Sequence, residues 1–202
     1  MRSAGNDEMN AETMRLAGKY QGQGVCGTDL AGSESHFPMS GYRTLFGTAR
    51  TLGIPFTIHA GEAAGVESMQ QAVEFGARRI GHGIRAYNDA ATRALLIERG
   101  VCLEFCPTSN LQTQAVSGVT AMHQYPIRPF LDDSVSVCIN TDNMTVSGTT
   151  LSQEIQQLHD AGVITADDAR KMVYNAVEHA FIGDTEKIEL RKKVDLRLAE
   201  GR

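Results

Sequence analysis

Short apolar runs alternate with longer amphipathic stretches along most of this chain, and this alternation constrains its fold more than any other feature. The apolar runs are continuous and lie at residues 24–29, 55–58, 79–81, 101–105 and 135–140. Amphipathic stretches before and between them predict helices at 9–20, 40–52, 64–76, 88–99 and 122–132. Parallel strands need crossover connections of this length, and strands covered on both faces are apolar throughout. The pattern therefore predicts a parallel α/β fold, either doubly wound or a barrel.

Three more helices are predicted after the fifth strand, at residues 149–161, 166–181 and 184–199. The segment Thr165–Asp168 has the form of a capping box and predicts the start of the second of them. Gly53, Gly76 and Gly100 each stand just before a predicted strand, where a glycine commonly ends a helix. No internal boundary is evident, so residues 1–202 are expected to belong to a single domain.

Polar residues stand at the C-terminal ends of all five predicted strands: Asp29, His59, His82, the segment Thr108–Asn110, and Asp142. In a (β/α)8 barrel these ends converge on one mouth from every strand. In an open doubly wound sheet they meet only at the switch point. The distribution favours a barrel, and a glycine-rich phosphate loop is absent, because Gly22 and Gly24 precede a strand instead of following one.

Charge and composition exclude several classes of protein. The 202 residues carry a formal net charge of −5, whereas nucleic acids and anionic membranes require a basic surface. No apolar run approaches the roughly 20 residues that span a bilayer, and residues 1–10 are polar and lack a signal core. A cytoplasmic location is expected. Cys26, Cys102, Cys106 and Cys138 lie in apolar runs without paired CxxC spacing, so we expect four reduced, buried thiols.

His59 and Glu62 are the strongest indication of chemistry. They are three residues apart at the end of a predicted strand and are joined by Ala60 and Gly61. There an imidazole can hold a metal ion and a carboxyl group can move a proton. Together with His82 and Asp142 at two other strand ends, they predict a metal-assisted hydrolase.

Five segments carry a resemblance to a known family: residues 27–32 (GTDLAG), 57–62 (TIHAGE), 79–83 (RIGHG), 103–110 (LEFCPTSN) and 139–143 (INTDN). Their order and approximate spacing resemble those of the adenosine deaminases, members of the metal-dependent amidohydrolase superfamily. The resemblance runs from about residue 9 to the C-terminus. It implies an incomplete (β/α)8 barrel, about five of eight βα units, with these strands as the fourth to eighth.

The resemblance also implies a reaction, a metal and roles for individual residues. Adenosine would be hydrolysed to inosine and ammonia, in purine salvage, with Zn²⁺ as the cofactor. His59 and Asp142 correspond to zinc ligands. Glu62 corresponds to the general acid that protonates N1 of the purine, and His82 to the residue that stabilises and orients the attacking hydroxide.

Two further positions bear on this interpretation. Gly32 corresponds to a glycine whose backbone N–H contacts the purine, which a residue without a side chain permits. Asn143 stands where the best-known members have a second aspartate that aligns the water. Asparagine can accept a hydrogen bond but cannot take up a proton. His36, His123, His159 and His179 lack a strand-end context and are expected to be surface or packing residues.

The resemblance leaves the zinc site incomplete. The family's first strand carries a His-x-His pair that supplies two ligands, but this sequence contains no His-x-His. His59 and Asp142 alone give two protein ligands, and zinc sites normally have three or four. We therefore expect the isolated chain to bind Zn²⁺ weakly and to deaminate adenosine poorly.

Several alternatives follow from the missing ligands. The chain could be a truncated product, a chain with a mis-assigned start, or half of a split enzyme that associates with the missing N-terminal segment or another chain. It could also be a non-catalytic remnant. Within the enzyme class, adenine or another aminopurine is an alternative substrate, and neither nucleic acid nor membrane is expected as a partner.

Overall fold

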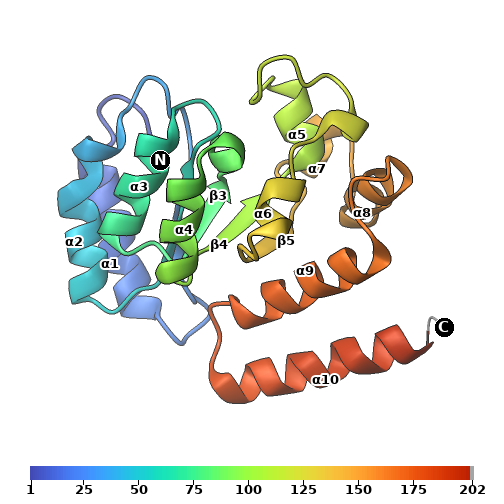
Figure 1. Cartoon of the computed structure of the whole chain (residues 1–202). Coiled ribbons are helices and arrows are strands. Elements are labelled where there is room, and N and C mark those ends of the chain that lie inside the picture. Colours follow the sequence, from blue (N-terminus) through green and yellow to red (C-terminus); the bar gives the residue numbers. More distant parts are fainter. Residues whose placement is uncertain (201–202) are drawn as a thin grey trace.

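A five-stranded parallel sheet forms the centre of the structure, a computed structural model in which residues 1–200 are described (Figure 1). The strands are β1 (Thr28–Leu30), β2 (Phe56–Ala60), β3 (Arg79–His82), β4 (Cys102–Phe105) and β5 (Val137–Ile139). Each strand pairs with its neighbour in sequence, in the order β1-β2-β3-β4-β5. A doubly wound sheet reverses its strand order at a switch point, whereas a barrel does not. The sequential order confirms the barrel-type prediction over the doubly wound one.

Helices precede and connect the strands as the sequence predicts. They are α1 (Asp7–Tyr20), α2 (Arg43–Thr51), α3 (Val66–Phe75), α4 (Ala90–Glu98) and α6 (Arg128–Asp132). After β5 follow α8 (Leu151–Asp160), α9 (Ala166–Glu178) and α10 (Asp184–Glu200). Figure 1 shows α1 to α4 grouped on one side of the sheet, with α9 and α10 side by side at the other.

Local signals place several of these boundaries correctly. Thr165 and Asp168 form the predicted reciprocal capping box at the start of α9. Gly53, Gly76 and Gly100 all have positive φ, at 68°, 95° and 61°, as helix-terminating glycines do. Each of them lies directly after a helix or its last turn, so the chain reverses there toward the next strand.

Other boundaries differ from the prediction. The expected helix at 40–52 begins as a 3₁₀ turn, η1 (Met39–Tyr42). The expected helix at 122–132 is divided into η3 (Met122–Gln124) and α6, because Pro126 and Pro129 lie between or inside them. Three short elements at strand ends were not predicted, namely η2 (Ile84–Asn88), α5 (Pro107–Gln112) and α7 (Met144–Ser147).

The core lies between the sheet and its covering helices. Ile58, Ile80, Leu103 and Val137 are fully buried on four adjacent strands, and Phe130 of α6 packs edge-on against Phe105 of β4 at 4.9 Å between ring centroids. Among the described residues no helix combines the length and apolar character required to cross a membrane.

The expectation of four buried cysteines is wrong for one of them. Cys102, Cys106 and Cys138 are buried, but Cys26 is exposed. Cys26 lies in the loop that leads into β1, which begins only at Thr28, so its apolar neighbours do not form a covered strand. All four are free thiols.

Candidate active site

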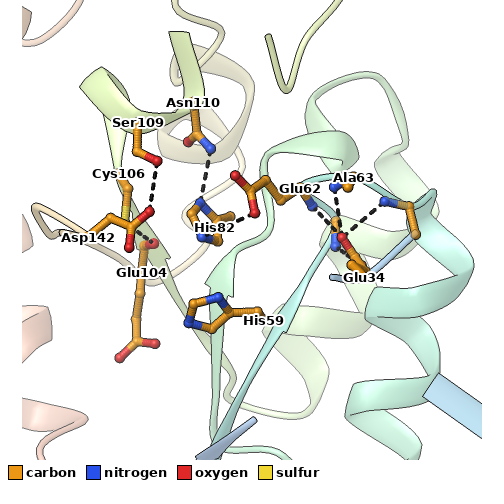
Figure 2. Close-up of polar contacts among 12 residues, drawn as sticks. Glu34, His59, Glu62, Ala63, His82, Glu104, Cys106, Ser109, Asn110 and Asp142 are labelled. Carbon is orange, nitrogen blue, oxygen red and sulfur yellow. Dashed lines mark hydrogen bonds and ion pairs between the residues drawn. The ribbon is translucent and has the colours of Figure 1, made fainter. Parts of the chain in front are cut away.

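His59, Glu62, His82 and Asp142 come together at the C-terminal edge of the sheet (Figure 2). His59 is the penultimate residue of β2 and His82 ends β3, and the two rings pack edge-on with centroids 5.0 Å apart. Glu62 follows β2, and its Oε2 lies 3.5 Å from Nε2 of His82. The structure thus brings together the residues that the strand-end pattern had singled out.

His59 is held from two sides. Its Nε2 lies 3.3 Å from Oδ2 of Asp29 at the end of β1, and its carbonyl oxygen accepts a hydrogen bond of 2.7 Å from the Arg2 guanidinium. Burial disfavours the charged imidazole, but the carboxylates of Asp29, Asp142 and Glu62 more than offset this and raise the pKa of His59 above its ordinary value.

His82 is in a different electrostatic environment, although it is only about 5 Å away. Its side chain is 2% exposed, and burial lowers its pKa below the ordinary value for histidine, with Glu62 acting in the opposite direction. Its Nδ1 lies 3.0 Å from the Asn110 side-chain nitrogen, and the Asn110 oxygen accepts a hydrogen bond of 2.8 Å from the Tyr125 hydroxyl.

Asp142 follows β5 and is oriented by Ser109, whose hydroxyl donates a hydrogen bond of 2.7 Å to Oδ2 of Asp142. Asp142 and His82 both have positive φ, at 54° and 63°. Non-glycine residues rarely adopt this backbone conformation, and such positions gather at functional sites. Two of them at the ends of β3 and β5 support the assignment of this edge as the site.

Glu34 is a site residue that the sequence prediction missed. The residue is 5% exposed, and its carboxylate faces the loop that carries Glu62 (Figure 2). Oε1 accepts the backbone N–H of Gly61 at 2.7 Å, and Oε2 accepts those of the next three residues, 62–64, at 3.0, 2.8 and 3.0 Å. Burial raises the pKa of Glu34, but the Ser68 hydroxyl and the backbone N–H groups of this loop outweigh burial, and the pKa is lowered overall.

Arg2, Asn110 and Tyr125 were also missed as individual residues. The loop at residues 31–40 was expected to help shape a pocket, and Glu34 lies within it. The available signal for Glu34 was a lone carboxylate next to a strand end. Tyr125 gave no such signal, because it lies 15 residues from Asn110 in a segment predicted to be helical.

Two predicted site residues have other contacts in this structure. Asn143 is exposed, and its side-chain oxygen accepts the Val146 N–H at 2.9 Å, so it caps α7. Gly32 has φ of 116°, and a Cβ there would lie 2.7 Å from the Arg2 carbonyl oxygen. The close approach of the Arg2 backbone therefore explains why a glycine is needed at this position. The contact with a purine stays a prediction.

The assignment of His59 and Asp142 as metal ligands stays a prediction. Imidazole and carboxylate are the donor types that Zn²⁺ uses, and His59 and Asp142 supply one of each. Within residues 1–200, however, no group of three or more His, Cys, Asp or Glu side chains is arranged to hold a metal ion. The remaining histidines, His36, His123, His159 and His179, lie away from this edge, and three of them are exposed.

Comparison with known proteins gives a family that agrees with this geometry. The family model described as adenosine deaminase matches residues 1–197. The adenosine deaminase of Haemophilus ducreyi is 42% identical over 200 residues, which cover 98% of this chain and 57% of that protein. The adenosine deaminase of Enterococcus faecalis is 41% identical over 182 residues, 90% of this chain and 53% of that protein.

Solved structures show the same fold. An adenine deaminase from Arthrobacter aurescens superposes with a TM-score of 0.83 at 23% identity, covering 96% of this chain and 59% of that one. The N6-methyl-AMP deaminase of Arabidopsis thaliana gives 0.84 at 24% identity, with 96% and 56% covered. A Burkholderia ambifaria amidohydrolase with bound zinc gives 0.85 at 19% identity, with 96% and 54% covered.

The fold is thus that of part of a parallel α/β barrel, with its candidate site at the carboxyl ends of the strands. The chain belongs to the adenosine deaminase family. It spans little more than half the length of the curated relatives it matches.

Proposed function

We propose that this chain is the C-terminal part of a zinc-dependent hydrolytic deaminase that converts adenosine to inosine and ammonia in purine salvage. The observation that supports this most directly is the convergence of His59, Glu62, His82 and Asp142 at one edge of the sheet. Relatives named adenosine deaminase, about 40% identical, support the choice of substrate.

In this proposal Glu62 handles the proton. Hydrolytic deamination adds water to C6 of the purine and expels the 6-amino group as ammonia, and the addition is easier when N1 is protonated. Glu62 would donate that proton from a carboxyl group fixed by the loop that Glu34 organises. His82 would donate a hydrogen bond from Nε2 to the oxygen that adds to C6, since this nitrogen faces the same space as the Glu62 carboxyl group.

His59 and Asp142 would hold the metal. Zn²⁺, when bound, lowers the pKa of water and so supplies hydroxide near neutral pH. Two donors fall short of the usual three or four, so further ligands are proposed to come from a segment or chain outside these residues. The isolated chain should then retain little zinc and deaminate poorly.

Complementation tests this proposal. We expect the chain, co-expressed with the N-terminal part of the Haemophilus ducreyi relative, to bind zinc stoichiometrically by elemental analysis and to deaminate adenosine in an absorbance assay. Glu62→Gln should lower the turnover rate by about 10²-fold or more, while zinc stays bound. Glu67→Gln, at an exposed glutamate of α3, is the matched control and should leave turnover unchanged.

Three results would contradict the proposal. Retained turnover in the Glu62→Gln enzyme would exclude Glu62 as the acid. Faster turnover of adenine or another aminopurine than of adenosine would assign a related deaminase. Failure of the complemented protein to bind zinc or to turn over any aminopurine would favour the alternative of a non-catalytic remnant.

A further inference from the structure

A hydrogen-bonded pair behind His82 is not used by the chemistry described above. Asn110 of α5 and Tyr125 are both 3% exposed, and His82 is 1% exposed. The Tyr125 hydroxyl contacts Oδ1 of Asn110 at 2.8 Å, and Nδ2 of Asn110 contacts Nδ1 of His82 at 3.0 Å. Asn110 and Glu62 thus contact different nitrogens of the His82 ring (Figure 2).

Tyr125 determines which end of the Asn110 amide faces His82. Burial holds the pKa of Tyr125 well above its ordinary value, so the hydroxyl keeps its proton. Among the described residues, the oxygen of Asn110 is the only acceptor that this hydroxyl contacts. Rotating the amide by half a turn would leave the buried O–H facing an NH₂ group, and a buried donor without an acceptor is costly. The amide nitrogen is therefore directed at His82.

The amide nitrogen can only donate, so the ring nitrogen that it meets must accept. A neutral imidazole has one accepting and one donating nitrogen. With Nδ1 accepting from Asn110, the proton of neutral His82 is on Nε2, the nitrogen 3.5 Å from the Glu62 carboxylate. We infer that the Tyr125–Asn110 pair positions His82 and fixes its neutral form as the Nε2–H tautomer.

This inference rests on the proposed function for its consequence. A protonated Nε2 can donate a hydrogen bond to an anionic oxygen between the strand ends, and it cannot remove a proton from that oxygen. His82 then acts by orienting and stabilising the attacking oxygen, and Asn110 and Tyr125 act through His82 without contacting substrate. The tautomer itself is a property of this chain and does not depend on metal or substrate.

Histidine tautomers can be read directly by NMR. We would label the full chain with ¹⁵N-histidine and record long-range ¹H–¹⁵N correlations at about pH 8, where a histidine of ordinary or lowered pKa is neutral. The patterns from Nδ1–H and Nε2–H rings differ. The chain has six histidines, and the His82→Gln variant identifies the signals of residue 82 by their loss.

The wild-type chain should show the His82 proton on Nε2. Tyr125→Phe keeps the ring that packs against Phe105 but removes the hydroxyl, so the amide can rotate. The ratio of Nε2–H to Nδ1–H should then fall about tenfold or more. Asn110→Asp presents an acceptor to Nδ1, which should become protonated. Tyr87→Phe, at a partly buried tyrosine outside this pair, should change nothing.

Two outcomes would overturn the inference. One is a His82 proton on Nδ1 in the wild-type chain, and this measurement needs no variant for comparison. The other is an unchanged tautomer ratio in Tyr125→Phe or Asn110→Asp while the amide spectrum shows a folded protein. Because these spectra need neither zinc nor adenosine, they are independent of the complementation assay. An inactive complemented enzyme with His82 in the Nε2–H form would refute the proposed function alone.

Discussion

Replacing Glu34 by glutamine tests how the loop that carries Glu62 is held. The carboxylate accepts four consecutive backbone N–H groups, one through Oε1 and three through Oε2. Glutamine has the same shape but only one accepting atom. If its oxygen takes the place of Oε2, its NH₂ group faces the Gly61 N–H, and that buried donor is left unpaired.

The size of the effect follows from these contacts. An unpaired buried N–H costs about 1–3 kcal/mol, and a hydrogen bond to a charged group contributes roughly 1 kcal/mol more than a neutral one. Burying a neutral amide costs less free energy than burying a carboxylate, and this difference offsets part of the destabilisation. We expect Glu34→Gln to lower the free energy of unfolding by about 2–4 kcal/mol at pH 7.

The pH dependence has a definite sign. The pKa of Glu34 is lowered in the folded chain from an ordinary value of 4.5. The stabilisation by this carboxylate is therefore complete above that ordinary value and is lost as the pH falls through the lower folded pKa. The glutamine variant lacks this contribution at every pH. The difference in stability between wild type and variant should thus shrink as the pH is lowered below about 4.5.

Urea unfolding followed by circular dichroism, at pH 7 and at successively lower pH, measures both effects. Glu67→Gln is the control, because Glu67 is exposed on α3, and it should change stability by less than about 0.5 kcal/mol. A Glu34→Gln chain as stable as the Glu67→Gln chain at pH 7 would refute the reasoning, as would a difference that grows on acidification.

Two further predictions concern packing. Gly32→Ala should lower the free energy of unfolding by about 2 kcal/mol or more, because φ is 116° and the new Cβ would lie 2.7 Å from the Arg2 carbonyl oxygen. Urea unfolding compares it with Gly41→Ala, where no atom lies within 4 Å of the added Cβ, and equal stability of the two variants would argue against the close approach. In the folded chain a maleimide should label one thiol quickly, at Cys26, and all four in denaturant, because the other three are buried. Mass spectrometry counts the labels, and rapid modification of Cys102, Cys106 or Cys138 under native conditions would contradict their burial.

Most of the sheet could be predicted from the sequence, because each parallel strand is a local apolar run and helix-ending glycines precede β2, β3 and β4. Residues 55–58, 79–81 and 101–105 all overlap observed strands. The short helices α5 and α7 were not predicted, because each has fewer than seven residues and no full amphipathic period. The division of residues 122–132 into η3 and α6 depends on prolines, and an argument from apolar periodicity alone does not take them into account.

The candidate site could be predicted only where a residue stands at a strand end. His59, His82 and Asp142 follow directly from that rule, and Glu62 from its distance to His59. Which residue contacts which does not follow, because hydrogen bonds between residues 28 or more positions apart leave no local pattern. Glu34 reaches the loop after β2 across such a distance, and so does Asn110 in reaching His82.

The sequence by itself determined the parallel α/β class and the residue types offered at each strand end. Both are local, since they depend on the period of apolar residues and on which side chain follows each strand. Only the tertiary structure decided the environment of each side chain. Burial lowers the pKa of His82, whereas at His59 the nearby carboxylates outweigh burial and raise the pKa. Asn110, distant in sequence, contacts the His82 ring. Burial and charge act through space, and proximity in space is set by the assembled sheet.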